Sequence, residues 1–120
     1  MSRLAMIRDY YRRIDRQDID WVVALFASDA VYERADARYA GRDAIEHFFR
    51  AERLIRGIHT IATLTQDETG RIFARGQFEG RGAADDARSV RFADVWEFRS
   101  DDKVCFRQTY LALGHAYVER

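Results

Sequence analysis

The chain has one cysteine, no proline and almost no lysine. A lone Cys105 among 120 residues excludes an internal disulfide and a metal cluster built on thiolates. Because proline, low-complexity tracts and repeats are all absent, no linker is visible, and residues 1–120 are predicted to form a single domain. Lys103 is the only lysine, so the basic residues are nearly all arginine, which is typical of a GC-rich bacterial genome.

An excess of either charge is also missing, since 20 basic residues face 20 acidic ones. The arginines are interleaved with acids, so the sequence predicts no nucleic-acid partner. No apolar run approaches the length of a membrane span, and the N-terminus lacks the apolar core of a signal peptide. We therefore expect a soluble, cytoplasmic protein that has no membrane partner.

Residues 89–98 are the most informative stretch, because their strict alternation predicts a β-strand. Phe92 and Trp96 lie on one face of this strand, and Asp94 is placed between them. A carboxylate on an aromatic face is costly to bury unless it is paired, becomes neutral or serves a pocket. Asp94 is therefore either a proton donor or base in an apolar cavity, or a structural partner of an arginine or a tyrosine hydroxyl.

Apolar residues spaced by three and four predict three helices ahead of this strand. Gly57 would end the third helix, and residues 35–40 are predicted to form a polar connecting segment. Hairpin-connected strands after these helices predict an α+β domain. In it, a curved antiparallel β-sheet wrapped by three N-terminal helices forms a cone that encloses a pocket. The predicted ranges are 3–16, about 18–26 and 41–57 for the helices, and 30–34, 58–65, 71–82, 89–98 and 104–113 for the strands.

Several local strings resemble the nuclear transport factor 2-like superfamily, which includes ketosteroid isomerase and the SnoaL-like polyketide cyclases. Together they cover nearly the whole chain, and the resemblance implies the cone-shaped fold. One scaffold in this superfamily serves several reactions and some non-enzymes, so the resemblance does not fix the reaction. The matching strings are Tyr10 with residues 18–20, residues 24–33, residues 41–45 with Phe48 and Phe49, and residues 93–98 with 103–104 and 109–110.

The resemblance also implies roles for single residues. Tyr10 and Asp94 stand where ketosteroid isomerase has the tyrosine and the protonated aspartic acid of its oxyanion hole. Arg34 replaces the general-base aspartate of that enzyme, and Phe49 replaces a supporting tyrosine. Asp36 shares the strand parity of Arg34 and would reach the site if the segment stays extended.

His59 and Tyr10 each have both a functional and a structural interpretation. His59, near the start of a predicted strand, is a candidate general base, or else a hydrogen-bonded or solvated histidine. Tyr10 could hold a substrate oxygen or fill the helix–sheet interface, whereas Tyr11 is better explained as core. The residues expected to line the pocket and bind substrate are Tyr32, Arg34, Phe48, Trp96 and Leu111.

The leading hypothesis is a small enzyme that acts without cofactor or metal on a hydrophobic cyclic or polyketide-like carbonyl compound. It would catalyse isomerisation, cyclisation or dehydration by proton transfer, with Asp94, Tyr10 and His59 as catalytic residues. The second hypothesis is a non-catalytic small-molecule-binding or dimerisation module, which Arg34 at the position of the base favours. The third is an epoxide hydrolase-like activity that uses Arg34, Asp36 and Asp94.

The outer face of the predicted sheet is too apolar to be left in contact with water. Ala93, Val95, Gln108 and Tyr110 share that face. We therefore expect a homodimer that forms through it.

Overall fold

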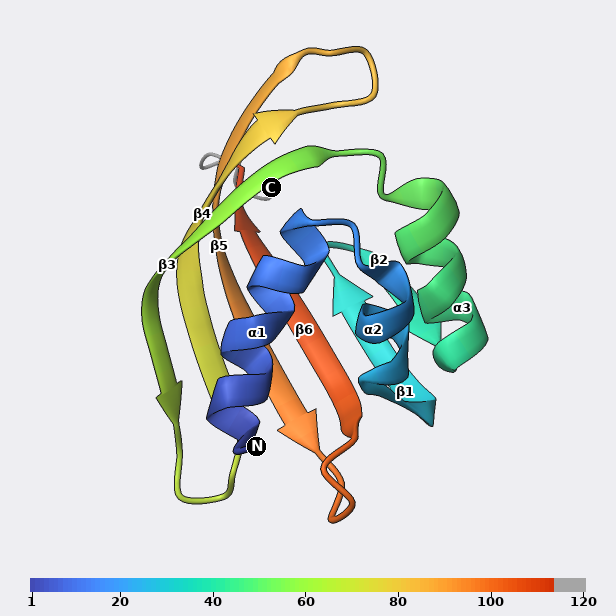
Figure 1. The fold of residues 1–120 in the computed structure, drawn as a ribbon, viewed down its shortest axis with the longest axis vertical. Helices are drawn as coiled ribbons and strands as arrows, with labels where there is room; N and C mark the ends of the chain where they lie inside the picture. Colours follow the sequence, from blue (N-terminus) through green and yellow to red (C-terminus); the bar gives the residue numbers. More distant parts are fainter. Residues whose placement is uncertain (114–120) are drawn as a thin grey trace, which may run out of the picture.

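The computed structural model describes residues 1–113, and it has the predicted α+β class, with three helices and a curved six-stranded sheet that does not close into a barrel (Figure 1). The elements are α1 (Arg3–Asp15), α2 (Ile19–Ala24), β1 (Phe26–Arg34), β2 (Ala37–Ala40), α3 (Arg42–His47), the π-helix η1 (Phe48–Glu52), β3 (Arg56–Gln66), β4 (Ile72–Arg81), β5 (Ala87–Phe98) and β6 (Val104–Ala112).

The strand order is β2-β1-β6-β5-β4-β3, and one pair departs from the predicted antiparallel arrangement. Strands β3 to β6 are joined by hairpins and pair antiparallel, as predicted. Strand β1 pairs with β6 in parallel, so the sheet is mixed. A parallel pair cannot be joined by a hairpin, and its two strands are therefore distant in the sequence. Turn residues between neighbouring segments predict hairpins, and they cannot predict a parallel pair of distant strands.

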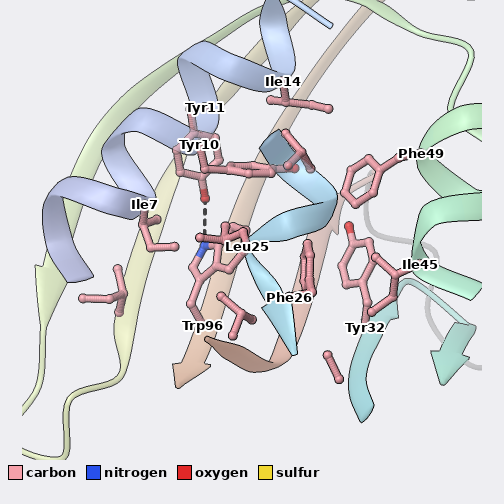
Figure 2. Close-up of a cluster of buried hydrophobic side chains, with 14 of the residues drawn as sticks. Ile7, Tyr10, Tyr11, Ile14, Leu25, Phe26, Tyr32, Ile45, Phe49 and Trp96 are labelled. Atoms are coloured by element: carbon pink, nitrogen blue, oxygen red, sulfur yellow. Dashed lines mark hydrogen bonds between the residues drawn. The ribbon is translucent and has the colours of Figure 1, made fainter. Parts of the chain in front are cut away.

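Helix α1 crosses the concave face of the sheet, while α2 and α3 lie beside β1 and β2 (Figure 1). The buried face of α1 carries Ile7, Tyr11 and Ile14, as the predicted spacing of three and four requires, together with Tyr10. This face packs over Trp96 of β5, which is fully buried (Figure 2). The alternation of β5 is confirmed, and the aromatic face that carries Asp94 is the inner one.

Two predicted boundaries are wrong near β1. Phe26 begins β1 and pairs with Val104, although the spacing had placed it on the second helix. Residues 35–40 contain the edge strand β2, because Ala35, with a φ of 52°, reverses the chain and lets residues 37–40 pair with β1. The alternation of half-buried and exposed residues in β2 spans only four residues, which is too short a pattern to detect.

The third helix is shorter than predicted. Its α-helical part ends at His47, and one π-helical turn follows before the chain becomes extended at Arg53. Gly57, predicted to end the helix, belongs to β3. A Cβ at Gly57 would collide with the carbonyl oxygen of Glu79 on β4, so this glycine is needed where the two strands approach closely.

None of the helices within residues 1–113 combines the length and the apolar character that crossing a lipid bilayer requires.

Candidate active site

The concave face of the sheet, α1 and η1 enclose a small inner cavity of about 50 Å³. One water molecule requires roughly 10–15 Å³ of such space, so the cavity has room for a few waters or one small group of a ligand. Its wall combines aromatic and aliphatic side chains with arginine, histidine and aspartate. The lining residues are Tyr10, Tyr32, Arg34, Phe48, Phe49, Arg53, Ile55, His59, Phe78, Val90, Phe92, Asp94, Arg107, Thr109 and Leu111.

A wider outer hollow of about 310 Å³ adjoins the inner cavity. The two share five lining residues, so the hollow forms the mouth of the cavity. Most of the shared residues are apolar, and Arg34 is the exception. The site therefore has a narrow polar end and a wider, largely apolar mouth. The shared residues are Arg34, Ile55, Phe78, Val90 and Leu111.

Asp94 lies in the inner wall with a residue exposure of only 1%, and its carboxylate is surrounded by donors. The Tyr11 hydroxyl donates to Oδ2 at 2.5 Å, and Nη2 of Arg107 donates to the same oxygen at 3.1 Å. The Thr109 hydroxyl donates to Oδ1, which Nε of Arg107 also approaches at 3.4 Å. These contacts match the structural alternative that the sequence left open for Asp94.

The guanidinium of Arg107 is stacked among aromatic rings. It lies 4.3 Å from the ring centroid of Trp96 and 4.7 Å from those of Tyr10 and Tyr32. Burial alone would lower the pKa of Arg107, but the charge of Asp94 and the nearby phenols outweigh it and raise the pKa well above its ordinary value. Arg107 therefore stays charged and holds Asp94 and Tyr10 together.

Tyr10 is positioned as a hydrogen-bond donor to a ligand. Its hydroxyl oxygen accepts a hydrogen bond from Nη1 of Arg107 at 2.7 Å. Burial raises the pKa of Tyr10 to about 12, against the opposing charge of Arg107, so the phenol keeps its proton at neutral pH. Within residues 1–113 this proton has no acceptor, and it is free to be donated into the cavity. Tyr11, expected as core, is the tyrosine that contacts Asp94, and its hydroxyl also accepts from the Trp96 indole (Figure 2).

His59 lines the wall and pairs with Asp15, which lies outside the lining. Nδ1 of His59 lies 2.5 Å from Oδ1 of Asp15, and the backbone N–H of His59 donates to Oδ2 at 2.8 Å. Because a carboxylate only accepts, Nδ1 carries the ring proton and Nε2 is the basic nitrogen. The imidazole packs against Phe78 and Phe92, with centroids 4.9 and 5.4 Å away. The side chains of His59 and Asp15 keep 11% and 10% exposure.

Two further arginines belong to the wall. Nη1 of Arg53 is buried and has no hydrogen-bond partner within the described residues. Burial lowers the pKa of Arg53, and the nearby Tyr10 opposes this effect. The Arg34 guanidinium lies 5.7 Å from the ring centroid of Phe48, at the mouth of the cavity.

The remaining candidates from the sequence are placed as follows. Tyr32, Arg34, Phe48 and Leu111 lie on the cavity wall. Trp96 was expected there, but it lies in the core beneath Arg107, outside the lining. Asp36 does not meet the condition set for it: the chain turns at Ala35, and Asp36 is exposed.

Five polar residues of the site were not among the candidate site residues from the sequence. Arg107 and Thr109 share the strand parity of Leu111, and this alternation could have revealed them. Asp15 reaches His59 only through the tertiary fold, and the sequence carries no signal for that pair. Within the described residues, no group of three or more histidine, cysteine or acidic side chains is arranged to hold a metal ion. The five residues are Tyr11, Asp15, Arg53, Arg107 and Thr109.

The family model for the SnoaL-like domain matches residues 7–106. The chain belongs to this family. The resemblance to the nuclear transport factor 2-like superfamily is therefore confirmed, and it extends over most of the chain. No curated protein matches the chain significantly.

Solved structures that resemble this chain include the epoxide hydrolase/cyclase-like enzyme SalBIII, from pyran ring formation in the polyether salinomycin. It is 16% identical, with 92% of this chain and 91% of SalBIII covered and a TM-score of 0.83. A protein of Pseudomonas putida KT2440, provisionally named a polyketide cyclase, is 19% identical over 92% and 91% of the two chains, with a TM-score of 0.81. A ketosteroid isomerase-like protein of Catenulispora acidiphila DSM 44928, solved with trimethylamine, is 17% identical over 88% and 83%, with a TM-score of 0.74. At these identities the likeness establishes the fold.

Proposed function

We propose that the protein is an enzyme that moves a proton on a hydrophobic cyclic or polyketide-like carbonyl compound, in an isomerisation, cyclisation or dehydration. The observation that carries this proposal is that His59, which is paired with Asp15, lines the same cavity as Tyr10 with its free hydroxyl proton. A base and an oxyanion donor facing one cavity are the two groups that such chemistry needs. The names of the similar structures, a cyclase and an epoxide hydrolase/cyclase-like enzyme, support the same class.

In the proposed reaction, Nε2 of His59 takes a proton from the carbon beside the carbonyl group. The electron pair of the broken C–H bond moves toward the carbonyl oxygen, which becomes an enolate oxygen and accepts a hydrogen bond from Tyr10. The protonated imidazole then returns the proton to a different carbon, or gives it to a departing hydroxyl group. Asp15 keeps the imidazole in the required tautomer and stabilises its positive form.

Asp94 was the first catalytic candidate, and its catalytic role stays a prediction. Its contacts support a different role, because Arg107, Tyr11 and Thr109 already donate to both of its oxygens. We propose that Asp94 is a positioning residue. It holds Arg107, and Arg107 in turn holds the Tyr10 hydroxyl.

The second candidate function is a non-catalytic binding module, and the small inner volume of about 50 Å³ favours it. The third hypothesis loses its geometric basis, because Asp36 is exposed in a turn.

We further propose a homodimer through the outer sheet face. Tyr110 keeps 55% exposure there, and Ala93 and Tyr110 line an open hollow of about 490 Å³. Equilibrium sedimentation would test it, since Tyr110→Asp should yield monomers while the wild type sediments as a dimer.

Deuterium exchange tests the proposed enzyme without knowledge of the substrate. The protein is incubated in D₂O with cyclic enones, cyclic ketones and β-hydroxy ketones, and deuterium at the carbons beside the carbonyl is followed by NMR. We expect one class to exchange faster than in buffer, and His59→Gln to lose about 10²–10⁴-fold of that acceleration. His47→Gln is the matched control, since its side chain is 68% exposed on α3. Exchange no faster than in buffer would favour the binding module, whereas equal acceleration in wild type and His59→Gln would show that His59 is not the base.

A further inference from the structure

The lining of the inner cavity has more guanidinium groups than carboxylates. Three arginines and one aspartate line it, namely Arg34, Arg53, Arg107 and Asp94. The aspartate is engaged by Arg107 at 3.1 Å. Within residues 1–113, neither Arg34 nor Arg53 lies within salt-bridge distance of an acidic side chain. Both guanidinium groups line the cavity without a paired carboxylate among these residues, although the charge of Asp15, outside the lining, also acts on Arg53.

Arg53 says more than Arg34 about the ligand, because a hydrogen bond fixes the backbone of Arg53 beside the cavity. Its N–H donates to the Phe48 carbonyl oxygen at 2.8 Å and closes the π-turn, and the residue itself is extended, with φ −83° and ψ 90°. The residue lines the cavity, and its Nη1 is buried without a hydrogen-bond partner among residues 1–113. A buried guanidinium donor without an acceptor is unfavourable, and an anion from outside the chain would relieve that cost.

The neighbours of Arg53 define which anion fits. The inner cavity is small, and the mouth beside it is largely apolar. Its wall holds five apolar residues and three polar ones, namely Ile55, Phe78, Val90, Leu111 and Leu113, and Arg34, Arg88 and Ser89. Guanidinium groups bind planar carboxylates in preference to neutral amides or esters. A small anionic head with an apolar body satisfies both parts of the site.

We propose that Arg53 anchors a carboxylate of the ligand, so that the substrate is an apolar carboxylic acid whose anionic head enters the inner cavity. Calling this ligand a substrate rests on the proposed function. Its binding, however, can be measured without turnover. Arg34, at the mouth, adds attraction for the same negative charge.

Isothermal titration with matched pairs tests the anchor. The pairs are benzoate and benzamide, cinnamate and cinnamamide, and 2-naphthoate and 2-naphthamide, which share a body and differ in charge. We expect the wild type to bind at least one carboxylate about tenfold or more tightly than its amide, as a charge-assisted hydrogen bond provides. Arg53→Met should bring this ratio close to one, and Arg53→Lys should keep part of it.

Arg56→Gln is the matched control, because Arg56 is an exposed arginine three residues away and does not line the cavity. It should keep the wild-type ratio. Arg53→Met removes an unpartnered charge, so we expect it to melt at or above the wild-type temperature, and loss of binding then cannot be assigned to unfolding. A wild-type ratio near one in all three pairs, or a ratio that survives Arg53→Met, overturns the anchor.

His59→Gln separates this inference from the proposed function. The variant should lose deuterium exchange and keep the carboxylate preference. No preference together with His59-dependent exchange would refute the anchor and leave the enzyme. A preference together with exchange no faster than in buffer would refute the enzyme and leave an acid-binding module, whereas accelerated exchange that is independent of His59 would refute only His59 as the base.

Discussion

Two aspartates of this site have different surroundings: Asp94 is buried in the cavity wall, and Asp15 is half-buried and contacts His59 of the wall. Asp94 receives donors from Tyr11, Arg107 and Thr109, which lie on two elements other than its own. Asp15 receives both of its donors, Nδ1 and the backbone N–H, from His59 alone. A carboxylate surrounded by several donors fixes their positions. A carboxylate bonded to one imidazole instead fixes the tautomer of that ring and leaves its second nitrogen available.

The solvent exposure of the side chains also differs between the Asp94–Arg107 pair and the Asp15–His59 pair. Asp94 and Arg107 have side-chain exposures of 1% and 5%, whereas Asp15 and His59 keep 10% and 11%. A fully enclosed ion pair with satisfied oxygens has no free position for a substrate atom. The imidazole lies at the edge of the cavity, where one can arrive. We infer that the first pair stabilises the site and the second reacts in it.

Asp94→Asn should give the largest effect of the variants considered, and the effect should be on folding. The amide keeps the shape but leaves Arg107 as an uncompensated buried charge, which costs about 3–5 kcal/mol of unfolding free energy. Urea unfolding followed by tryptophan fluorescence measures the loss. Asp101→Asn is the control, since the Asp101–Arg99 pair is exposed and should change the free energy of unfolding far less. If Asp94 were the proton carrier, stability and ligand binding would survive and turnover alone would collapse.

Asp15→Asn should act on the reaction more than on the fold. An amide can stabilise the wrong tautomer of His59, and we expect the exchange rate to fall on the order of a hundredfold, about 3 kcal/mol in activation free energy. NMR-detected exchange measures it. Asp9→Asn is the control on the same helix, because Asp9 pairs with Arg12 and Arg13 and does not line the cavity.

The double variant Asp15→Asn/His59→Gln sharpens that result. Residues that act as one unit are not additive, so the pair should be no slower than His59→Gln alone. Additive losses would mean that Asp15 contributes by another route.

The difference between the two aspartates also explains what the sequence could predict. The alternation around Asp94 revealed a carboxylate on an aromatic face, because local periodicity reports the face on which a residue lies. The same alternation in β6 would place Arg107 and Thr109 beside Leu111. Asp15 carries no such signal, because its partner His59 is 44 residues away and only the crossing of α1 over the sheet joins them.

The fold was easier to predict from the sequence than the site, for the same reason. Helix α1 and the strands from β3 onward follow local periodicity and hairpin turns, which the sequence displays. The parallel pairing of β1 with β6, the strand β2 and the π-turn at Arg53 depend on tertiary contacts. Fold class was thus predictable, whereas the contacts that assign roles were not.

Alkaline pH should lower the free energy of unfolding through Tyr10 and Tyr11, which contact the buried Asp94–Arg107 pair. Burial raises the pKa of Tyr10 from 10.0 to about 12, and that of Tyr11 well above 10.0. The unfolded phenols ionise first, so this stabilisation is complete below pH 10 and is lost as the pH rises through about 12. Two pKa units correspond to about 2–3 kcal/mol for Tyr10. Urea unfolding between pH 9 and 12 measures the slope, and Tyr10→Phe should show a shallower one. Equal slopes would mean that Tyr10 ionises as freely in the folded state.

Thr109→Val should give the smallest of these effects. The Thr109 proton is donated to Asp94, so the Tyr32 hydroxyl, 3.0 Å away, must donate to the Thr109 oxygen. Valine keeps the volume but removes the link, and we expect a loss of about 1–2 kcal/mol of unfolding free energy, with Thr109→Ser close to wild type. Tyr32→Phe should cost less than Thr109→Val, because it removes only the outer donor and leaves the bond to Asp94 intact. The reverse order would show that Asp94 does not depend on the Thr109 hydroxyl, and its surroundings would then include an oxygen that a substrate proton could reach.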